Sequence, residues 1–356
     1  MQELAHEVYM RRCLQLAALA VGNVAPNPMV GAVLVSNGTI IGEGWHQNYG
    51  GPHAEVHCIA EALKNHPEKI GRSTLYVSLE PCAHYGKTPP CTDLIIQHKI
   101  PKVVIGCRDS FEKVDGKGIA KLHKAGIEVI TGVLENEAIA LNRAFFTFHE
   151  QKRPYIILKW AQTADGFIAG AGNERLLISN DYSNRLVHKW RTHAAAIMVG
   201  ANTAIKDDPL LDNRNWTGPA PKKVLFDPRL KVPAHLRLFN SKDVVFVINT
   251  VKDAVMQNIL YIKTAKPDII KNTLHQLYQL NIQSVLVEGG RGLLQSFIDA
   301  AIWDEAYVIT NKSLLANGGL PAPLLTGQHK LKEERLLNDE ITYFKNGKNN
   351  KIYAAA

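Results

Sequence analysis

The spacing of hydrophobic and polar residues predicts alternating helices and strands in the first part of the chain. Residues 3–20 place apolar side chains three or four positions apart, which is typical of an amphipathic helix. The β-branched runs at 29–35 and 39–44 flank Asn37-Gly38 and predict a hairpin. Further helices are predicted over 54–64, 91–98, 118–125 and 134–148, and further strands over 74–78, 103–106 and 127–131. This alternation predicts a mixed or parallel sheet with helices on its faces.

A second unit is predicted to begin where the charge density rises, around residues 150–154. Strands are predicted over 155–160, 194–199, 224–226, 244–248 and 284–287. Helices are predicted over 181–192, with Ser179 as its cap, and from the glycine turn at 289–292 through Phe297. We therefore expect two domains, residues 1–149 and 150–356.

Length and charge agree with two domains and narrow the class of partner. The chain has 356 residues, 46% of them hydrophobic and 21% charged, and its net charge is +8. A chain of this length is more often two domains than one. The Lys and Arg residues are dispersed, with no run longer than two, so the basic excess does not argue for nucleic acid. A mild positive charge instead suits an anionic small molecule.

The cysteines indicate a reducing compartment. Their number is five, which is odd, and two of them belong to the metal motif described below. The others lie in apolar surroundings, so the pattern is not a disulfide framework. No signal peptide or apolar stretch of membrane-spanning length is visible. We therefore expect a cytoplasmic protein with no membrane partner.

Residues 53–91 contain the most specific chemical pattern in the chain. His53, Cys82 and Cys91 are a plausible three-ligand zinc set, which leaves the fourth tetrahedral position open for catalysis. Glu55 follows two residues after the histidine, as in the His-x-Glu and Pro-Cys signature of zinc base deaminases. A zinc ion lowers the pKa of coordinated water to about 7, and Glu55 can move protons without binding the metal.

Two other interpretations of this pattern are weighed against catalysis. Two cysteines in a long chain are often buried packing residues. The metal site could instead be structural, but a structural site leaves Glu55 and the open position unexplained. The joint occurrence of all four residues favours a catalytic zinc centre.

A glycine-rich turn at Gly289-Gly290-Arg291-Gly292 is a candidate anion site in the second unit. It lies between a predicted strand and a predicted helix, where free backbone amides can meet a phosphate. The pattern is not a full Gly-x-Gly-x-x-Gly fingerprint, so a simple tight turn remains open as the alternative.

At this point the chain resembles the family of bifunctional riboflavin-biosynthesis deaminase-reductases over almost its whole length. In the first half, the resemblance rests on residues 25–31, 44–46, 53–55 and the 81–91 loop with its Gly-Lys-Thr-Pro-Pro. In the second half, it rests on Lys159, Asp165-Gly166, Thr203, Asp207-Asp208-Pro209, Leu211, Arg214 and Glu288-Gly289-Gly290.

The resemblance implies a cytidine-deaminase-like α/β/α domain followed by a dihydrofolate-reductase-like α/β domain, each with one reaction. The first would deaminate 2,5-diamino-6-hydroxy-4-(5-phosphoribosylamino)pyrimidine hydrolytically, with one zinc ion per chain. The second would use NADPH to reduce the ribosyl group of the product to a ribityl chain. It also implies a homo-oligomer, a dimer or a tetramer, that acts on a small molecule and not on nucleic acid.

The resemblance also implies roles for particular residues. His53, Cys82 and Cys91 would hold zinc, and Glu55 would shuttle protons. The substrate would be contacted by Asn27, His46, His84, Lys87, Arg175, Arg191, Leu211, Arg214 and Glu288, although His46 and His84 could simply be loop residues. The cofactor would be contacted by Ala161, Leu177, Thr203, Asp207, Gly290, Arg291, Gly292, Leu293, Leu294, Gln295 and Ser296.

Two positions depart from the family pattern. The family usually has Ser where Arg175 stands and Trp where Leu177 stands. An arginine can still meet an anion, whereas the loss of the aromatic ring puts a stacking contact with the cofactor in doubt.

A rival hypothesis keeps the zinc chemistry and changes the substrate. A nucleoside or tRNA-base deaminase with an accessory C-terminal domain would need a basic surface with exposed aromatic residues. The dispersed charge and the long loop between Cys82 and Cys91 speak against it.

Overall fold

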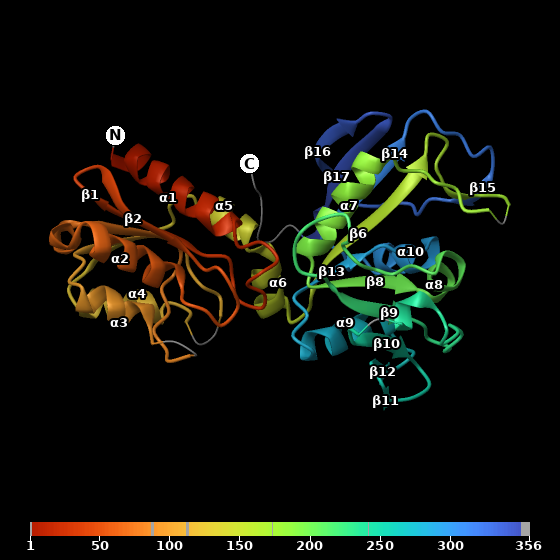
Figure 1. Ribbon diagram of the computed structural model, residues 1–356, viewed down its shortest axis with the longest axis horizontal. Coiled ribbons are helices and arrows are strands. Elements are labelled where there is room, and N and C mark those ends of the chain that lie inside the picture. The colour runs from red at the N-terminus through yellow and green to blue at the C-terminus, as the bar shows by residue number, and fades with distance from the viewer. Residues whose placement is uncertain (1, 87–88, 112–113, 173, 241, 350–356) are drawn as a thin grey trace. The chain divides into compact units, whose positions relative to one another are not determined.

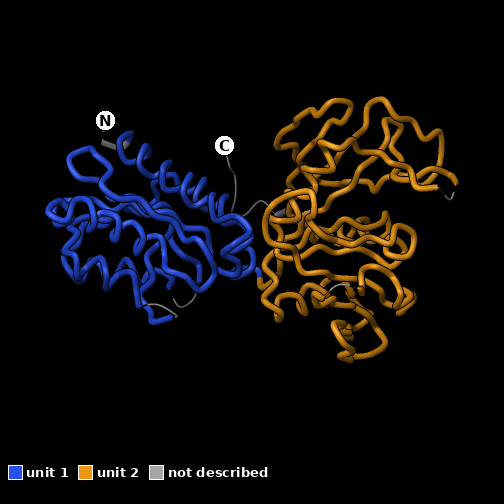
Figure 2. The backbone as a smooth tube through the Cα atoms, in the orientation of Figure 1, with its two compact units in different colours: residues 1–151, 352–356 blue, residues 152–351 orange. Residues whose placement is uncertain are grey.

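The structure is a computed structural model that describes residues 2–86, 89–111, 114–172, 174–240 and 242–349. The chain forms two compact units, residues 1–151 and 152–351 (Figure 2). In the part of the chain that is described, no helix combines the length and the apolar composition needed to cross a membrane.

The first unit is built on a five-stranded mixed sheet in the order β2-β1-β3-β4-β5 (Figure 1). The strands are β1 (Gly31–Ser36), β2 (Thr39–Trp45), β3 (Thr74–Leu79), β4 (Lys102–Cys107) and β5 (Glu128–Thr131). β1 pairs antiparallel with β2 and β3, whereas β3, β4 and β5 are parallel. Side-chain burial along β1, β3 and β4 is nearly continuous, as expected for strands covered on both faces.

Helices cover both faces of this sheet, which confirms the predicted α/β/α architecture. One face packs against α2 (Ala54–Asn65), α3 (Cys91–Gln97) and α4 (Lys117–Lys124). The other packs against α1 (Gln2–Ala18) and the segment that contains α5 (Glu135–Leu141) and α6 (Arg143–Gln151).

The prediction of one continuous helix over 134–148 is wrong, because the helix breaks at Asn142. The side chain of Asn142 is buried and bonds both main-chain groups of Met29, with its Oδ1 accepting from N–H and its Nδ2 donating to C=O. The two hydrogen bonds are each 2.8 Å long. The main chain at Asn142 has a φ of −101°, and its N–H donates to the carbonyl oxygen of Ile139 at 3.1 Å, so α5 ends and α6 begins on either side of it.

The second unit contains a ten-stranded sheet in the order β11-β12-β10-β9-β8-β13-β6-β14-β17-β16. The strands from β12 to β14 are parallel, and antiparallel strands lie at both edges. The strands are β6 (Tyr155–Thr163), β8 (Ala196–Gly200), β9 (Lys222–Phe226), β10 (Val245–Asn249), β11 (Ala254–Met256), β12 (Ile259–Lys263), β13 (Ser284–Val287), β14 (Glu305–Asn311), β16 (Gln328–Leu336) and β17 (Asp339–Asn346). A small separate pair joins β7 (Phe167–Gly170) to β15 (Gly319–Pro321).

Helices again lie on both faces of the sheet in the second unit. α9 (Ile269–Gln279) and α10 (Arg291–Asp299) pack on one face around the buried Trp303 and Phe297. α7 (Asp181–His193) and α8 (Ala201–Asp207) pack on the other. The cap of α7 is Asn180, whose side chain accepts the Ser183 N–H at 3.0 Å, and not Ser179 as predicted.

Gly31 provides a test of how tightly α1 packs on the sheet. A Cβ atom at this position would lie 2.0 Å from the carbonyl oxygen of Cys13, a backbone atom that cannot move aside alone. We predict that Gly31→Ala lowers the opening free energy of β1 and β3 by about 3 kcal/mol, because over-packing forces the helix away from the sheet. Hydrogen exchange of the amides in these strands measures the change.

The matched control is Gly71→Ala, because a Cβ atom there would meet open space. The opening free energies of β1 and β3 in this variant should stay within about 0.5 kcal/mol of the wild-type values. Equal protection in the two variants would contradict the close packing of α1.

Candidate metal centre and cofactor cavities

His53, Cys82 and Cys91 come together in the first unit although 38 residues separate the first from the last. Their ligand atoms all lie within 4.8 Å of one another. His53 Nδ1 is 3.2 Å from Cys91 Sγ and 3.6 Å from Cys82 Sγ. His53 caps α2 and Cys91 is the first residue of α3, so two helix starts and the turn after β3 deliver the three side chains.

This donor set fits a zinc ion. A tetrahedral zinc with Zn–N of about 2.0–2.1 Å and Zn–S of about 2.3 Å holds its ligand atoms about 3.6 Å apart. The spacing in the cluster is close to that value. The backbone N–H of Cys91 points to Cys82 Sγ at 3.3 Å, and a hydrogen bond from the Cys91 thiol lowers the pKa of the Cys82 thiol. Both contacts favour the thiolate that binds metal.

Glu55 lies beside this cluster in the first turn of α2, and it is only 3% exposed. Burial raises the pKa of its carboxyl group, although the His53 imidazole opposes that effect. Carboxyl groups that must both take up and release protons near neutral pH are tuned upward in this manner. Glu55 therefore has the position and the environment of a proton-transfer group next to a metal.

A second buried carboxylate, Glu80, supports the loop that carries Cys82. It accepts backbone N–H groups from Asp109, Gly116, Gly118 and Ile119 at 2.9–3.3 Å. Two of its donors, Gly118 and Ile119, lie in the first turn of α4. The carboxylate ties the turn after β3 to a separate segment of the unit, and sequence reasoning did not single it out.

Some of the other residues predicted for this site lie near the cluster. Asn27 Nδ2 is 3.0 Å from His46 Nε2, and His46 Nδ1 is 2.9 Å from the carbonyl oxygen of Pro52. The His46 ring packs edge-on against His53 with centroids 5.4 Å apart. His84 is half-buried, and its Nδ1 has no partner among the described residues. Lys87 lies outside the described residues.

Two adjoining cavities open at the carboxyl ends of the central strands in the second unit. Ligands bind at this end of open α/β sheets. The first cavity has a volume of 1030 Å³ and the second of 650 Å³. Six residues line both of them, namely Lys159, Arg175, Asn184, Thr203, Asp207 and Glu288. A molecule in one cavity can therefore meet a molecule in the other at this shared wall.

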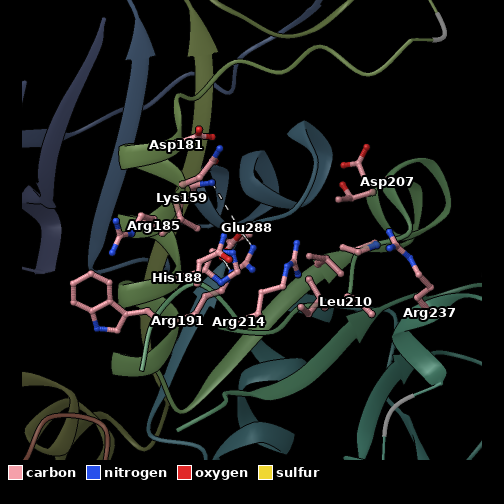
Figure 3. Close-up of a pocket in the computed structure, with 18 of the residues that line it drawn as sticks. Lys159, Asp181, Arg185, His188, Arg191, Asp207, Leu210, Arg214, Arg237 and Glu288 are labelled. Atoms are coloured by element: carbon pink, nitrogen blue, oxygen red, sulfur yellow. Dashed lines mark hydrogen bonds and ion pairs between the residues drawn. The ribbon is translucent and has the colours of Figure 1, made fainter. Parts of the chain in front are cut away.

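The first cavity is rich in positive charge. Its lining includes the predicted Arg191, Leu211 and Arg214, together with Arg185 and Arg237, which were not predicted (Figure 3). Arg214 donates to Asp212 Oδ1 at 2.6 Å but remains mostly exposed, so it can turn toward a ligand. Guanidinium groups at a cavity wall suit a phosphate.

Glu288 is the buried centre of this cavity. Arg191 donates to both of its carboxylate oxygens, at 2.7 and 2.8 Å, and Lys159 Nζ lies 3.9 Å away (Figure 3). Burial raises the pKa of Glu288, but Arg191 and Lys159 overcome that effect and hold the pKa at about 2. Arg191 Nη1 also donates to the carbonyl oxygen of Asp212. Arg191 is thus largely occupied within the protein, with two of its five N–H groups left for a ligand.

The second cavity is lined by the glycine turn that the sequence singled out. Gly289 and Gly290 are required there, because a Cβ atom on Gly289 would lie 2.6 Å from Val199 Cα and Gly290 adopts a φ of 51°. Eight predicted residues among those described contribute to this cavity's lining but not to the first, namely Ala161, Leu177, Gly290, Arg291, Gly292, Leu293, Leu294 and Ser296. The amino end of α10 therefore faces a cavity large enough for part of a dinucleotide.

Two of the cofactor predictions have a different geometry. Leu177 lines the second cavity and is 75% exposed, so it presents an uncovered apolar surface. Gln295 does not line the cavity. Its side-chain oxygen accepts the N–H of Leu324 at 2.9 Å and its amide donates to Asp299 at 2.8 Å, because it lies on the outer face of α10.

Sequence reasoning also missed residues along α7. Asp181, Asn184, Arg185 and His188, none of them predicted, line the first cavity together with the predicted Arg191. They follow a spacing of three or four residues, so one face of the helix is polar. That spacing was a signal in the sequence, but a solvent-facing surface produces the same pattern.

Comparison with known proteins defines the class. The model of the cytidine and deoxycytidylate deaminase zinc-binding region matches residues 4–107, and that of the RibD C-terminal domain matches residues 154–348. The chain therefore joins a zinc-binding deaminase to a reductase domain, as the resemblance predicted.

Known proteins match the chain over most of its length and most of their own. The riboflavin biosynthesis protein RibD of Aquifex aeolicus is 40% identical, over 87% of this chain and 88% of its own. That of Actinobacillus pleuropneumoniae is 36% identical, over 89% and 86%. A solved deaminase/reductase from Thermotoga maritima superposes with a TM-score of 0.89 at 35% identity, over 97% of this chain and all of its own.

The chain belongs to the RibD family. It is thus a bifunctional deaminase-reductase of riboflavin biosynthesis, with zinc in the deaminase unit and NADPH as the reductase cofactor. The fold class predicted from the sequence is confirmed in both units.

The Glu288 network predicts a dependence of stability on pH. The folded pKa lies below the unfolded value of about 4.5, so the ionised pair stabilises the fold above that pH. The contribution disappears as the pH falls toward 2. Glu288→Gln should lower the unfolding free energy by about 3 kcal/mol at pH 7. Its difference from the wild type should shrink between pH 5 and pH 2, as measured by urea unfolding.

The control for this experiment is Glu333→Gln, which removes an exposed carboxylate paired with Lys330. An exposed pair adds little to stability, so the unfolding curves should nearly coincide with the wild type. A Glu288 difference that is the same at pH 3 and pH 7 would contradict the ion-pair network.

Proposed function

We propose that the first unit, residues 1–149, deaminates 2,5-diamino-6-hydroxy-4-(5-phosphoribosylamino)pyrimidine to 5-amino-6-(5-phosphoribosylamino)uracil. The second unit, residues 150–356, then reduces the ribosyl group to give 5-amino-6-(5-phosphoribitylamino)uracil. The observation that carries this proposal is the three-ligand cluster with Glu55 beside it, in a chain that also contains two joined cavities. The Thermotoga maritima relative is a diaminohydroxyphosphoribosylaminopyrimidine deaminase/5-amino-6-(5-phosphoribosylamino)uracil reductase, which supports these two substrates.

In the deamination, His53, Cys82 and Cys91 would hold the metal. When bound, zinc lowers the pKa of the attacking water to about 7. Glu55 would take one proton from the attacking water and pass it to the pyrimidine ring nitrogen. It would then take the remaining proton of the added hydroxyl group and pass it to the amino group, which leaves as ammonia. Its burial beside His53 supports this cycle, because a raised carboxyl pKa lets the group be protonated in one step and ionised in the next.

Asn27 and His46 are proposed to orient the pyrimidine, and His84 and Lys87 to contact the ribosyl phosphate. The 3.0 Å contact between Asn27 and His46, and the packing of His46 against His53, support a shared substrate wall. The unpartnered Nδ1 of His84 supports a ligand contact, since buried polar atoms usually have a partner.

In the reduction, the substrate would occupy the first cavity and the cofactor the second. When bound, NADPH supplies the hydride that the ribosyl C1′ receives. Arg175 and Arg214 are proposed to bind the phosphate, Leu211 to pack against the substrate, and Arg191 to hold Glu288 in place. Lys159 is a proton donor for the sugar oxygen as the ring opens. Burial lowers the pKa of Lys159, which makes the proton easier to release.

The cofactor is proposed to lie along the turn at 290–296 and against Ala161, Thr203 and Asp207. The free amides at the start of α10 suit its pyrophosphate. Leu177 would replace the aromatic contact usual in the family with an apolar one. Gln295 would support the turn from behind, through its bonds to residues 299 and 324.

We also propose a cytoplasmic homo-oligomer, a dimer or a tetramer, that binds neither nucleic acid nor membrane. The five free thiols support a reducing compartment. The rival tRNA-base deaminase leaves the two cavities of the second unit without a purpose.

The order of the two reactions can be tested with Glu55→Gln in the full-length, zinc-loaded protein. Loss of the proton carrier should slow ammonia release by at least about 100-fold. The variant should still oxidise NADPH when given the deaminated intermediate, because Glu55 belongs to the other unit. Wild type given the first substrate should release ammonia and then consume NADPH.

The matched control is Glu61→Gln, which changes a carboxylate of α2 that is not part of the cluster. It should retain both activities. Undiminished ammonia release by Glu55→Gln would refute the proton-transfer role. If wild type consumed no NADPH with either substrate, the reductase assignment would fail.

The departure at position 177 gives a test of the cofactor site. Leu177→Trp adds an aromatic surface at an exposed point of the second cavity. Stacking is worth about 0.5–1.5 kcal/mol, so the KM for NADPH should fall about two- to tenfold with kcat nearly unchanged. Leu315→Trp, at an exposed position outside both cavities, is the control. An unchanged KM in Leu177→Trp would mean that the cofactor does not reach this residue.

A further inference from the structure

His188 has a polar side chain in the wall of the first cavity, and the proposed function gives it no role. It lies on α7 and is only 6% exposed (Figure 3). Its Nδ1 atom is buried and has no hydrogen-bond partner among the described residues. A buried polar group left unpaired costs about 1–3 kcal/mol. The N–H of the neutral ring is therefore placed on Nε2, where it can reach the cavity, and Nδ1 stays an acceptor.

The surroundings of His188 keep its ring neutral. Burial lowers the pKa of the imidazole, and the guanidinium groups of Arg191 and Arg214 lower it further. Asp212 and Glu288 oppose this effect more weakly. A cationic ring would also bury an unpaired N–H at Nδ1. A neutral N–H at Nε2 can donate a hydrogen bond to a hydroxyl oxygen, but it brings no positive charge to a phosphate dianion.

The position of His188 in the cavity determines which part of the substrate it can contact. The ribosyl C1′ must lie at the shared wall, beside Lys159 and Glu288, to receive the hydride. The phosphate lies at the other end of the same sugar, near the exposed guanidinium of Arg214. The charges of Glu288 and Arg214 both act on the His188 ring, so His188 lies near each of them. The sugar carbons between C1′ and the phosphate carry hydroxyl groups.

We infer that His188 forms a hydrogen bond with the C2′ or C3′ hydroxyl group of the ribosyl moiety in the reductase site. The inference rests on the proposed substrate and adds a residue that would recognise the sugar. Because Nδ1 is buried, Nε2 is the ring nitrogen that can meet the ligand. The contact would help to fix the sugar so that C1′ faces the cofactor.

The test uses the full-length, zinc-loaded protein with the deaminated intermediate and NADPH. His188→Leu should lower kcat/KM for this substrate about tenfold, the effect of one lost hydrogen bond of about 1.4 kcal/mol. The KM for NADPH and the rate of ammonia release from the first substrate should stay within about twofold of wild type. His275→Leu, at an exposed histidine of α9 that lines neither cavity, is the matched control and should change nothing.

Substrates that lack one hydroxyl group separate recognition from a structural effect. Wild type should reduce the 2′-deoxy or the 3′-deoxy substrate about tenfold less efficiently than the intact one. In His188→Leu, that penalty should vanish for the hydroxyl that His188 contacts, because the partner is already absent. If the loss caused by His188→Leu and the loss caused by removing the hydroxyl group simply multiply for both deoxy substrates, the inference is overturned.

His188→Gln provides a second variant, since its amide reaches the place of Nε2. It should recover at least half of the lost efficiency on a logarithmic scale, and it carries the test if the Leu variant does not fold. Wild-type kinetics in both His188 variants would overturn this inference but would leave the proposed substrate unaffected. Failure of wild type to oxidise NADPH with the intermediate would instead refute the proposed substrate, and the inference with it.

Discussion

A buried carboxylate directly after a central strand ties each site of this protein to its sheet. Glu80 follows β3 in the first unit, and Glu288, whose side chain is 8% exposed, follows β13 in the second. A carboxylate removed from water is costly unless every lone pair finds a donor. That requirement recruits segments that are distant in the chain, and the recruited segments carry the functional side chains.

The two carboxylates meet this requirement with different donors, and the difference matches the chemistry nearby. Glu80 accepts hydrogen bonds from backbone amides, which are neutral and fixed. It therefore stabilises the loop without bringing charged donor groups next to the metal cluster. Glu288 uses a guanidinium and an ammonium group, which brings two cations to the wall between the cavities. An anionic substrate and an anionic cofactor can then approach the same wall, because the cations offset the carboxylate.

The sequence was most informative where local chemistry alone determines structure. The β-branched runs, the Asn37-Gly38 turn and the strand before Gly289 all predicted elements that the fold contains. The motif at His53, Cys82 and Cys91 predicted a cluster because two thiols and an imidazole with this spacing are typical metal ligands.

Local patterns failed where long-range contacts decide the outcome. At the break in the helix, Asn142 bonds Met29, which is more than a hundred residues away. The edge strand β16 was not predicted, since it has almost no buried residues to mark it. The strands β14 and β17 were also missed, although both have buried residues. His188 escaped notice because its spacing along α7 looks like an ordinary polar face, and only the packing of α7 against β13 turns that face into a cavity wall. A residue becomes informative there because the fold buries it without giving it a partner, which is a property of the three-dimensional environment and not of the sequence.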